Sequence, residues 1–295
     1  MNNAPERQSR LVSIDHYENF PVASWLCPPN IRPAVEAIYH FARTADDLAD
    51  EGTASAAHRL QQLAAYRLAL ERAADGEAAP GPWEGIFMRL AETISKHRLP
   101  LPPLRDLLSA FAQDTGNPVY PDRAALLDYC ARSANPVGRL LLHLAEVDDR
   151  DALAQSDSIC SALQLINFWQ DLSIDLPRGR IYITECDATR HGLDVRQLHA
   201  GADTGASRAL VKTLVSWARE TLLNGAPLVH RMPGRLGWEL RFVVQGGLRI
   251  LERIEASDCN ALSQRQTLNK ADLPSLAWRA LRMSRTPLRT ASQHP

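Results

Sequence analysis

The chain has 295 residues, of which 45% are hydrophobic, and a formal net charge of -1 at pH 7. This composition suits a globular protein with a sizeable core, and near-neutral charge without basic runs argues against a nucleic-acid-binding protein. The five cysteines form no CxxC pair, so we predict reduced thiols in the cytoplasm and neither disulfides nor a zinc site. No signal-peptide pattern and no membrane-spanning apolar run are found.

Apolar residues recur at helical spacing along most of the chain, and helix-breaking residues fall between the periodic segments. Pro33 near the front of the first segment and Asp122 at the head of the fifth are helix-start signals. The predicted helices cover residues 32–50, 56–75, 83–98, 103–114, 122–146, 151–175, 206–230, 235–257 and 271–284. The predicted fold class is therefore all-α. We expect one domain over residues 1–295, with a core from about 16 to 284, arranged as a helical bundle with a ligand site between helices.

Two aspartate pairs stand out in this helical pattern. Asp46 and Asp50 are four residues apart at the end of a strongly apolar segment, and Asp171 and Asp175 repeat that spacing at the end of another. On a helix, both carboxylates of such a pair lie on one face, where like charges repel. The same unfavourable arrangement thus occurs twice, more than a hundred residues apart.

This repetition predicts a cation between the pairs. A helix C-terminus carries partial negative charge, so acids placed there are disfavoured unless a cation is near. Magnesium takes one or two carboxylates per ion and completes its shell with water and substrate phosphate. Two facing pairs could therefore hold a diphosphate, whereas a solvated acidic face is the ordinary alternative for either pair alone.

Polar neighbours accompany each pair. Tyr39 and Arg43 share the helix face of the first pair, and Arg43 is read either as a diphosphate ligand or as a salt-bridge partner of the nearby acids. Gln164 and Asn167 lead into the second pair as one polar stripe, which lines either a ligand cavity or a satisfied core network.

Two further features bear on the site. Pro136 and Gly138 lie within the predicted helix 122–146 and should kink it, which either makes room beside a cavity or simply breaks the helix. After the second acid pair, Arg178 and Arg180 flank Gly179, and this turn is either a lid over a diphosphate or a charged turn. Walker A, GxSxG, HExxH and dinucleotide-binding motifs are absent.

Taken together, the two aspartate-rich helices, the tyrosine helix that ends in Val137-Gly138 and the run RGRIYI after the second pair resemble the squalene/phytoene synthase family. The resemblance extends from about residue 16 to 284. It implies a single-domain, all-α isoprenoid-synthase bundle with a central cavity. It also implies an enzyme that binds prenyl diphosphates through Mg²⁺ and ionises them.

The resemblance assigns roles to individual residues. Asp46, Asp50, Asp171 and Asp175, with Asn167, are expected to hold magnesium. Gln164 is expected nearer the reacting carbons, and Asn167, Arg43 and Tyr129 to act in catalysis. The implied substrate contacts are Tyr39, Arg43, Arg180 and Tyr182 at the diphosphate, and Phe20 and Phe41 along the hydrocarbon.

Within the family, residues 18–24 and the run FARTADDLADEG are most similar to bacterial hydroxysqualene synthases of hopanoid biosynthesis. Squalene and phytoene synthases commonly have Ser-Phe where Asn19-Phe20 stands here. The implied substrate is presqualene diphosphate, made by a partner synthase, and a reductase would consume the product. Gly246-Gly247, where some relatives carry a tyrosine, suggests a differently shaped pocket floor. A cytoplasmic enzyme follows, with peripheral contact at the inner membrane left open.

Two alternatives remain open on the sequence alone. A relative that condenses two farnesyl or geranylgeranyl diphosphates would use the same acid pairs. A non-catalytic paralogue that binds a prenyl diphosphate belongs to another class, but it has no need of four mutually repelling carboxylates.

Overall fold

A computed structural model describes residues 27–283 of the protein. All its regular elements are helices within those residues, which confirms the all-α prediction. The α-helices are α1 (Arg32–Asp50), α2 (Ala56–Ala74), α3 (Glu84–His97), α4 (Leu101–Asp114), α5 (Arg123–Ser133), α6 (Asn135–Leu144), α7 (Arg150–Gln170), α8 (Leu172–Asp175), α9 (Glu185–Arg190), α10 (Gly205–Gly225), α11 (Gly234–Ala256) and α12 (Leu273–Arg282). Short 3₁₀ turns are η1 (Leu176–Arg178), η2 (Val195–Gln197), η3 (Ala226–His230) and η4 (Lys270–Asp272).

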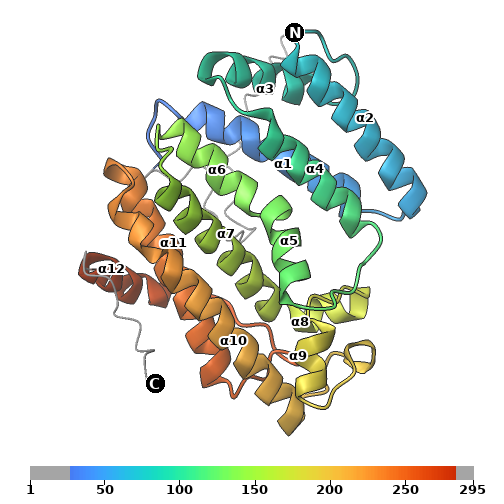
Figure 1. The fold of residues 1–295 in the computed structure, drawn as a ribbon, viewed down its shortest axis with the longest axis vertical. Helices are drawn as coiled ribbons and strands as arrows, with labels where there is room; N and C mark the ends of the chain where they lie inside the picture. The colour runs from blue at the N-terminus through green and yellow to red at the C-terminus, as the bar shows by residue number, and fades with distance from the viewer. Residues whose placement is uncertain (1–26, 284–295) are drawn as a thin grey trace, which may run out of the picture.

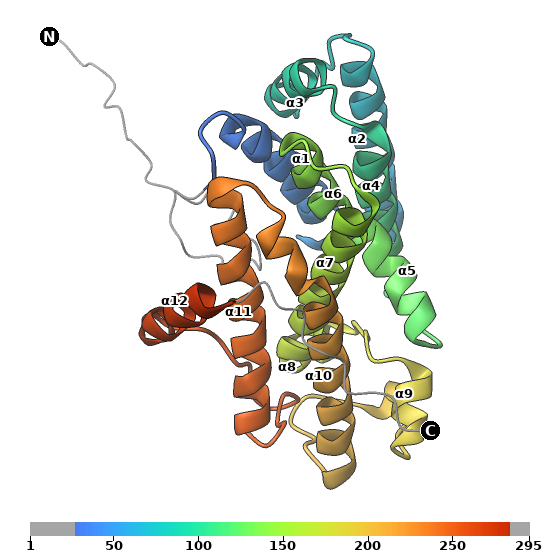
Figure 2. The ribbon, with the colours of Figure 1, turned by 60° about the vertical axis from the view of Figure 1, so that its left-hand side comes forward.

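Helix α7 runs through the middle of the bundle (Figure 1). It packs most extensively against α10 and also against α6, α5 and α11. Helices α2 and α3 lie at one end of the molecule and α9 at the other, while α12 projects to the side of α11 (Figures 1 and 2). Helix α1, which carries the first aspartate pair, and α7, directly followed by the second pair, therefore both lie within the body of the bundle.

The helix boundaries follow local chemistry. Pro33 occupies the first turn of α1, and the Asp122 carboxylate caps α5 by accepting from the Ala125 N–H at 2.9 Å. The predicted helix 122–146 is divided at Ala134, directly before Asn135-Pro136, because proline cannot donate the helical hydrogen bond. The expected kink is thus a break into α5 and α6.

The predicted helix 151–175 is also interrupted. Asp171 has φ −102° and ψ 11°, so α7 ends at Gln170 and the one-turn α8 follows. The Asp175 N–H still donates to the Asp171 carbonyl at 2.9 Å, so the helical spacing of the second pair is kept. Helix α9 was not predicted, because its six residues are too short to show apolar periodicity.

The buried apolar side chains form two clusters. One joins α1, α2, α3 and α4 around Phe41, Tyr66 and Phe87, and the other joins α7, α10 and α11 around Leu163, Trp169 and Leu214. The face of α1 that is not committed to the first cluster looks toward α7, and the site lies between these two helices. Within residues 27–283, no helix is long and apolar enough to cross a bilayer.

Candidate active site

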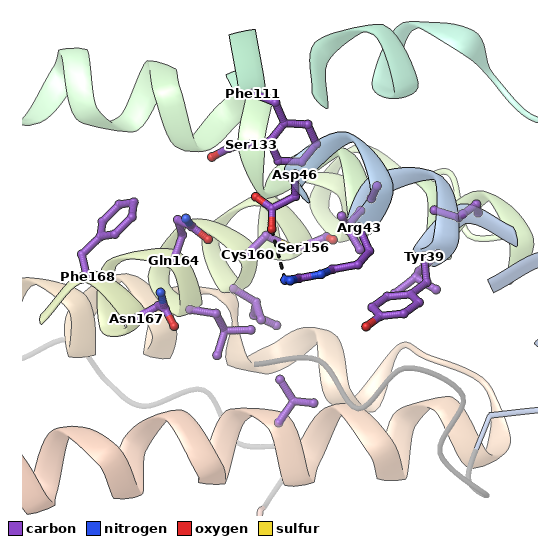
Figure 3. A pocket seen from close by; sticks show the side chains of 18 of the residues that line it. Tyr39, Arg43, Asp46, Phe111, Ser133, Ser156, Cys160, Gln164, Asn167 and Phe168 are labelled. Carbon is purple, nitrogen blue, oxygen red and sulfur yellow. Dashed lines mark hydrogen bonds and ion pairs between the residues drawn. The ribbon is translucent and has the colours of Figure 1, made fainter. Parts of the chain in front are cut away.

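A cavity of about 530 Å³ lies between α1, α7 and α11. Nearly all the residues predicted for the site line it. They are Tyr39, Arg43, Asp46, Asp50, Tyr129, Gln164, Asn167, Asp171, Asp175, Arg180 and Tyr182. Figure 3 shows Tyr39, Arg43 and Asp46 reaching into the cavity from α1, with Gln164 and Asn167 on α7 across from them.

The cavity is polar at one end and apolar at the other. Along α1 its lining passes from Val35 and Ile38 to Asp46 and Asp50, and along α7 from Ile159 to Asp171. The α1 stretch from Val35 to Asp50 covers 16 residues, or about 22 Å from end to end at the helical rise. Both acid pairs occur toward the C-terminal ends of their helices, so they meet at the same end of the cavity. The arrangement suits a long apolar chain with an anionic head.

The first acid pair is accompanied by an arginine on its own helix. Arg43 forms ion pairs with Asp46 at 3.3 Å, Asp47 at 2.7 Å and Glu51 at 3.0 Å. The salt-bridge interpretation of Arg43 is therefore observed. Its guanidinium also lines the cavity, where a phosphate could exchange for one of these carboxylates.

The second acid pair is more enclosed. The side chains of Asp171 and Asp175 are 15% and 12% exposed, against 42% and 32% for Asp46 and Asp50. Burial, reinforced by the neighbouring Asp171, raises the pKa of the Asp175 carboxyl to about 7. A buried carboxylate beside another acid is a group that a cation would stabilise.

Arg180 joins the two pairs. Its guanidinium is ion-paired with Asp50 and lies 3.9 Å from Asp175. This one arginine therefore contacts an acid of α1 and an acid of α8. The left-handed Gly179, with φ 75°, turns the chain after η1, and the Arg180 N–H donates to the Asp175 carbonyl at 3.0 Å. The predicted Arg-Gly-Arg segment is a turn that places Arg180 between the acid pairs.

Arg265 is a site residue that the sequence reasoning missed. It follows α11 and forms an ion pair with Asp171, its Nη2 donating to Oδ2 at 3.3 Å. It lines the cavity with the predicted residues. No motif surrounds it in the sequence, because its position depends on the loop between α11 and η4 folding back over the end of α7.

An aromatic group closes the cavity beside the second pair. The rings of Phe168 and Tyr182 are stacked with centroids 3.7 Å apart, and Tyr129 lies 6.1 Å from Tyr182. Burial raises the pKa of Tyr129 and that of Tyr182, so both hydroxyls remain protonated. Such faces exclude water and can stabilise a nearby positive charge.

Asp114, the last residue of α4, is a second missed residue. It lines the cavity, and its Oδ2 accepts the Tyr129 hydroxyl at 2.8 Å. Burial raises the pKa of this carboxyl to about 7, and the charge of Asp46 contributes. An isolated aspartate at the end of a predicted helix gave no sequence signal, because only the fold brings it to Tyr129.

Asp114→Asn is expected to stabilise the protein at pH 8 without divalent cations, raising Tm by about 3 °C. The pKa of Asp114 is near 4 in the unfolded chain and about 7 in the folded protein. Between these pH values the folded protein binds a proton that the unfolded chain has lost, so the stability of the parent protein falls as pH rises through this window. Asparagine lacks that charge but can still accept from Tyr129. Thermal melts from pH 4 to 8 test this; an equal Tm difference at both ends would contradict it.

Phe41 was predicted to contact the hydrocarbon, but it does not line the cavity. It is fully buried, stacked on Tyr66 at 5.4 Å between centroids, and belongs to the core of α1, α2 and α3 rather than to the cavity lining. It occupies the face of α1 opposite the acid pair, where an aromatic side chain packs against two others. Phe20, the other predicted hydrocarbon contact, lies outside the described residues.

The glycine pair on α11 also has another role. A Cβ on Gly247 would meet Ile166, Leu222 and Leu163 at 3.1 to 3.2 Å, so this glycine allows α11 to pack closely on α7 and α10. Neither glycine lines the cavity, and the idea of a reshaped pocket floor is not supported.

The chemistry of the donor set fits a hard divalent cation shared with a ligand. Among residues 27–283, no three carboxylate, histidine or cysteine side chains form a ready-made metal cage. The two aspartate pairs instead present oxygen ligands at one end of the cavity, where arginines now balance their charge. Magnesium commonly uses only one or two carboxylates, so phosphate oxygens would have to complete the shell.

Comparison with known proteins agrees with this geometry. A sequence profile of the squalene/phytoene synthase family matches residues 15–272. The hydroxysqualene synthase of Zymomonas mobilis is 35% identical, over 88% of this chain and 86% of that protein. The hydroxysqualene synthase of Rhodopseudomonas palustris is 32% identical, over 95% and 93%. The crystal structure of squalene synthase HpnC from Alicyclobacillus acidocaldarius superposes with a TM-score of 0.75 at 36% identity, covering 83% of this chain and 90% of that one.

Fold and relatives together define the class: this is an enzyme that processes prenyl diphosphates on the all-α isoprenoid-synthase fold. The profile match covers most of the chain, and several relatives exceed 30% identity over most of their length. The chain belongs to the squalene/phytoene synthase family.

Proposed function

We propose that the protein is a hydroxysqualene synthase, which converts presqualene diphosphate and water to hydroxysqualene and diphosphate. The observation that carries this is a cavity in which the two acid pairs gather at one end, while most of the remaining lining is apolar. A substrate with one long hydrocarbon and one diphosphate would place its apolar part and its charged part at the matching ends of this cavity. The relatives named hydroxysqualene synthase, at 35% and 32% identity, support this choice of reaction.

The diphosphate would bind at the polar end. Asp46, Asp50, Asp171 and Asp175, with the Asn167 amide, are the residues that would hold Mg²⁺, which would supply charge neutralisation to the leaving group. Exchange of carboxylate for phosphate at Arg43 and Arg180 would orient the diphosphate and release the carboxylates of Asp46 and Asp50 for Mg²⁺, whose charge would compensate both.

Ionisation breaks the bond between the carbinyl carbon and the diphosphate oxygen, and the electron pair leaves with the diphosphate. The cyclopropylcarbinyl cation then rearranges to an open allylic cation. The faces of Tyr129, Phe168 and Tyr182 exclude bulk water and stabilise positive charge on the carbon skeleton.

Water capture completes the reaction. The amides of Gln164 and Asn167 on α7 can hydrogen-bond one water in this wall of the cavity, to which the same helix also contributes Ser156. The water oxygen forms the new bond to carbon, and the proton it releases is taken up by the diphosphate. No reductant is consumed in this sequence.

Product analysis by gas chromatography–mass spectrometry tests the proposal. Presqualene diphosphate and farnesyl diphosphate are offered in separate tubes with Mg²⁺, in H₂¹⁸O and without nicotinamide. Hydroxysqualene carrying ¹⁸O from the first tube only is the expected result. A thirty-carbon product from farnesyl diphosphate alone would overturn the assignment of substrate while leaving the prenyl-diphosphate site in place.

Head-to-head condensation is the second candidate. The phytoene synthase of Thermus thermophilus is 30% identical over 93% of this chain and 91% of that protein. A relative named for a different reaction is therefore similar to this chain over most of its length. The farnesyl diphosphate tube, and a parallel one with geranylgeranyl diphosphate, decide between the two. A non-catalytic binding role predicts no diphosphate release from any of these substrates.

A further inference from the structure

A second cavity, of about 750 Å³, adjoins the polar end of the active-site cavity. It lies between the end of α1 with its following loop, the end of α4 and the turn after α8. Its walls come from residues 49–59, 114–117 and 178–180, and we call it the vestibule. Nearly all its side chains are polar or small, in contrast to the aliphatic far end of the active-site cavity.

The vestibule and the active-site cavity share a boundary. Asp50, Asp114 and Arg180 line both of them. Arg180 stands at this boundary because it is ion-paired with Asp50 on one side and lies 3.9 Å from Asp175 on the other. An anion that leaves the acid pairs past Arg180 therefore enters the vestibule directly.

Three arginines supply positive charge to the vestibule, and each is held differently. The guanidinium of Arg59 donates to the carbonyl oxygens of Ala49, Gly52 and Ala54 at 2.5, 2.8 and 3.1 Å, which fixes the loop after α1. Arg180 is shared between the acid pairs. Within residues 27–283, the Arg178 side chain has neither a hydrogen bond nor an ion pair, and it lines the vestibule.

Each acid of the vestibule has an ion-pair or hydrogen-bond partner other than Arg178 and Arg59, although Arg43 and Arg180 are shared with further carboxylates. Asp50 is ion-paired with Arg180, Glu51 pairs with Arg43 at 3.0 Å, and Asp114 accepts the Tyr129 hydroxyl. Among the described residues, no carboxylate of this cavity forms an ion pair with Arg178 or Arg59, and the charge of Arg178 acts at longer range on Asp175. Arginine donors in a polar recess are the usual means of binding phosphate oxygens.

From this placement we propose that the vestibule is a binding site for the diphosphate ion, with Arg178 as its free ligand, and that the diphosphate product leaves through it. The proposal rests on the function proposed above, in which each turnover makes one very apolar product and one highly charged one. The apolar product has no favourable contact with the polar vestibule. The diphosphate has none with the aliphatic end of the main cavity, so the two products separate by opposite routes.

Equilibrium binding of inorganic diphosphate with Mg²⁺ to the full chain, measured by calorimetry, tests this site. The double variant Asp46→Asn/Asp171→Asn weakens Mg²⁺-dependent binding in the main cavity but leaves Arg43 and Arg265 there, so the vestibule is identified by the further effect of Arg178→Gln in this background. Adding Arg178→Gln to that background is expected to weaken the remaining binding about tenfold. Arg89→Gln is the matched control, because Arg89 is an exposed arginine on α3 that lines neither cavity.

Two results would overturn the proposal: complete loss of diphosphate binding in Asp46→Asn/Asp171→Asn, or equal binding after addition of Arg178→Gln and of Arg89→Gln. Melting curves confirm that each variant is folded. The readout uses no prenyl substrate, so it is independent of product identity. If the parent protein makes no hydroxysqualene but the vestibule binds diphosphate as described, the proposed reaction fails and the diphosphate site stands.

Discussion

Asp175→Asn is expected to lower turnover about a thousandfold with little change in fold. Asp175 is the most enclosed of the four aspartates among the predicted ligands, with a side chain 12% exposed, and it faces Arg180 across the polar end of the cavity. Asparagine keeps the size and one oxygen but removes the negative charge that a divalent cation requires. Steady-state diphosphate release at saturating Mg²⁺ measures the effect.

The same substitution should make the cation-free protein more stable at pH 8. Burial and Asp171 raise the pKa of Asp175 to about 7, so its ionised form at pH 8 costs folding free energy that asparagine does not. Asp128→Asn is the control, because Asp128 is an exposed carboxylate on α5 with a side chain 71% exposed. Near-parental turnover in Asp175→Asn would remove this residue from the metal-binding role.

Gly225→Ala is expected to destabilise the protein by about 3 kcal/mol, lowering Tm by roughly 8 °C. A Cβ at this position, the last of α10, would lie 2.5 Å from the Gln155 carbonyl oxygen and 2.9 Å from the Ile159 backbone nitrogen. These are backbone atoms of α7, which cannot rotate away as the end of a side chain could. The two helices would have to separate, and α7 carries the polar stripe of the active site.

Gly205→Ala provides the matched control on the same helix. It is the first residue of α10, and a Cβ there meets no atom within 4 Å. Alanine is the better helix former, so Tm should stay constant or rise slightly. Thermal melts of both variants under one condition make the comparison. Equal melting temperatures would show that α7 and α10 do not need the close approach.

The fold class and most of the site were predictable because helical periodicity and spacing are local properties. Asp46 and Asp50 lie on one turn of α1 wherever that helix packs, and the second pair keeps its spacing through the bond from the Asp175 N–H. The break at Asn135-Pro136 was also visible, since proline acts on its own helix.

The errors concern contacts between distant segments. Phe41 is apolar and close to the first acid pair, but only the packing of α2 and α3 shows that it faces the core. Asp114 reaches the cavity from the end of α4 and Arg265 from the loop after α11, and the sequence places neither segment relative to α7. Periodicity gives the apolar face of a helix without identifying which neighbour covers it.

The break at Asp171 makes the two acid pairs mechanically unequal. Asp46 and Asp50 are carried by one uninterrupted 19-residue helix that is anchored in the core through Phe41 and Ala45, so their separation is fixed. Asp171 is the junction residue between α7 and α8, and Asp175 ends the single four-residue turn of α8. A change of backbone angle at Asp171 would therefore move Asp175 relative to α7, whereas no such break lies between Asp46 and Asp50.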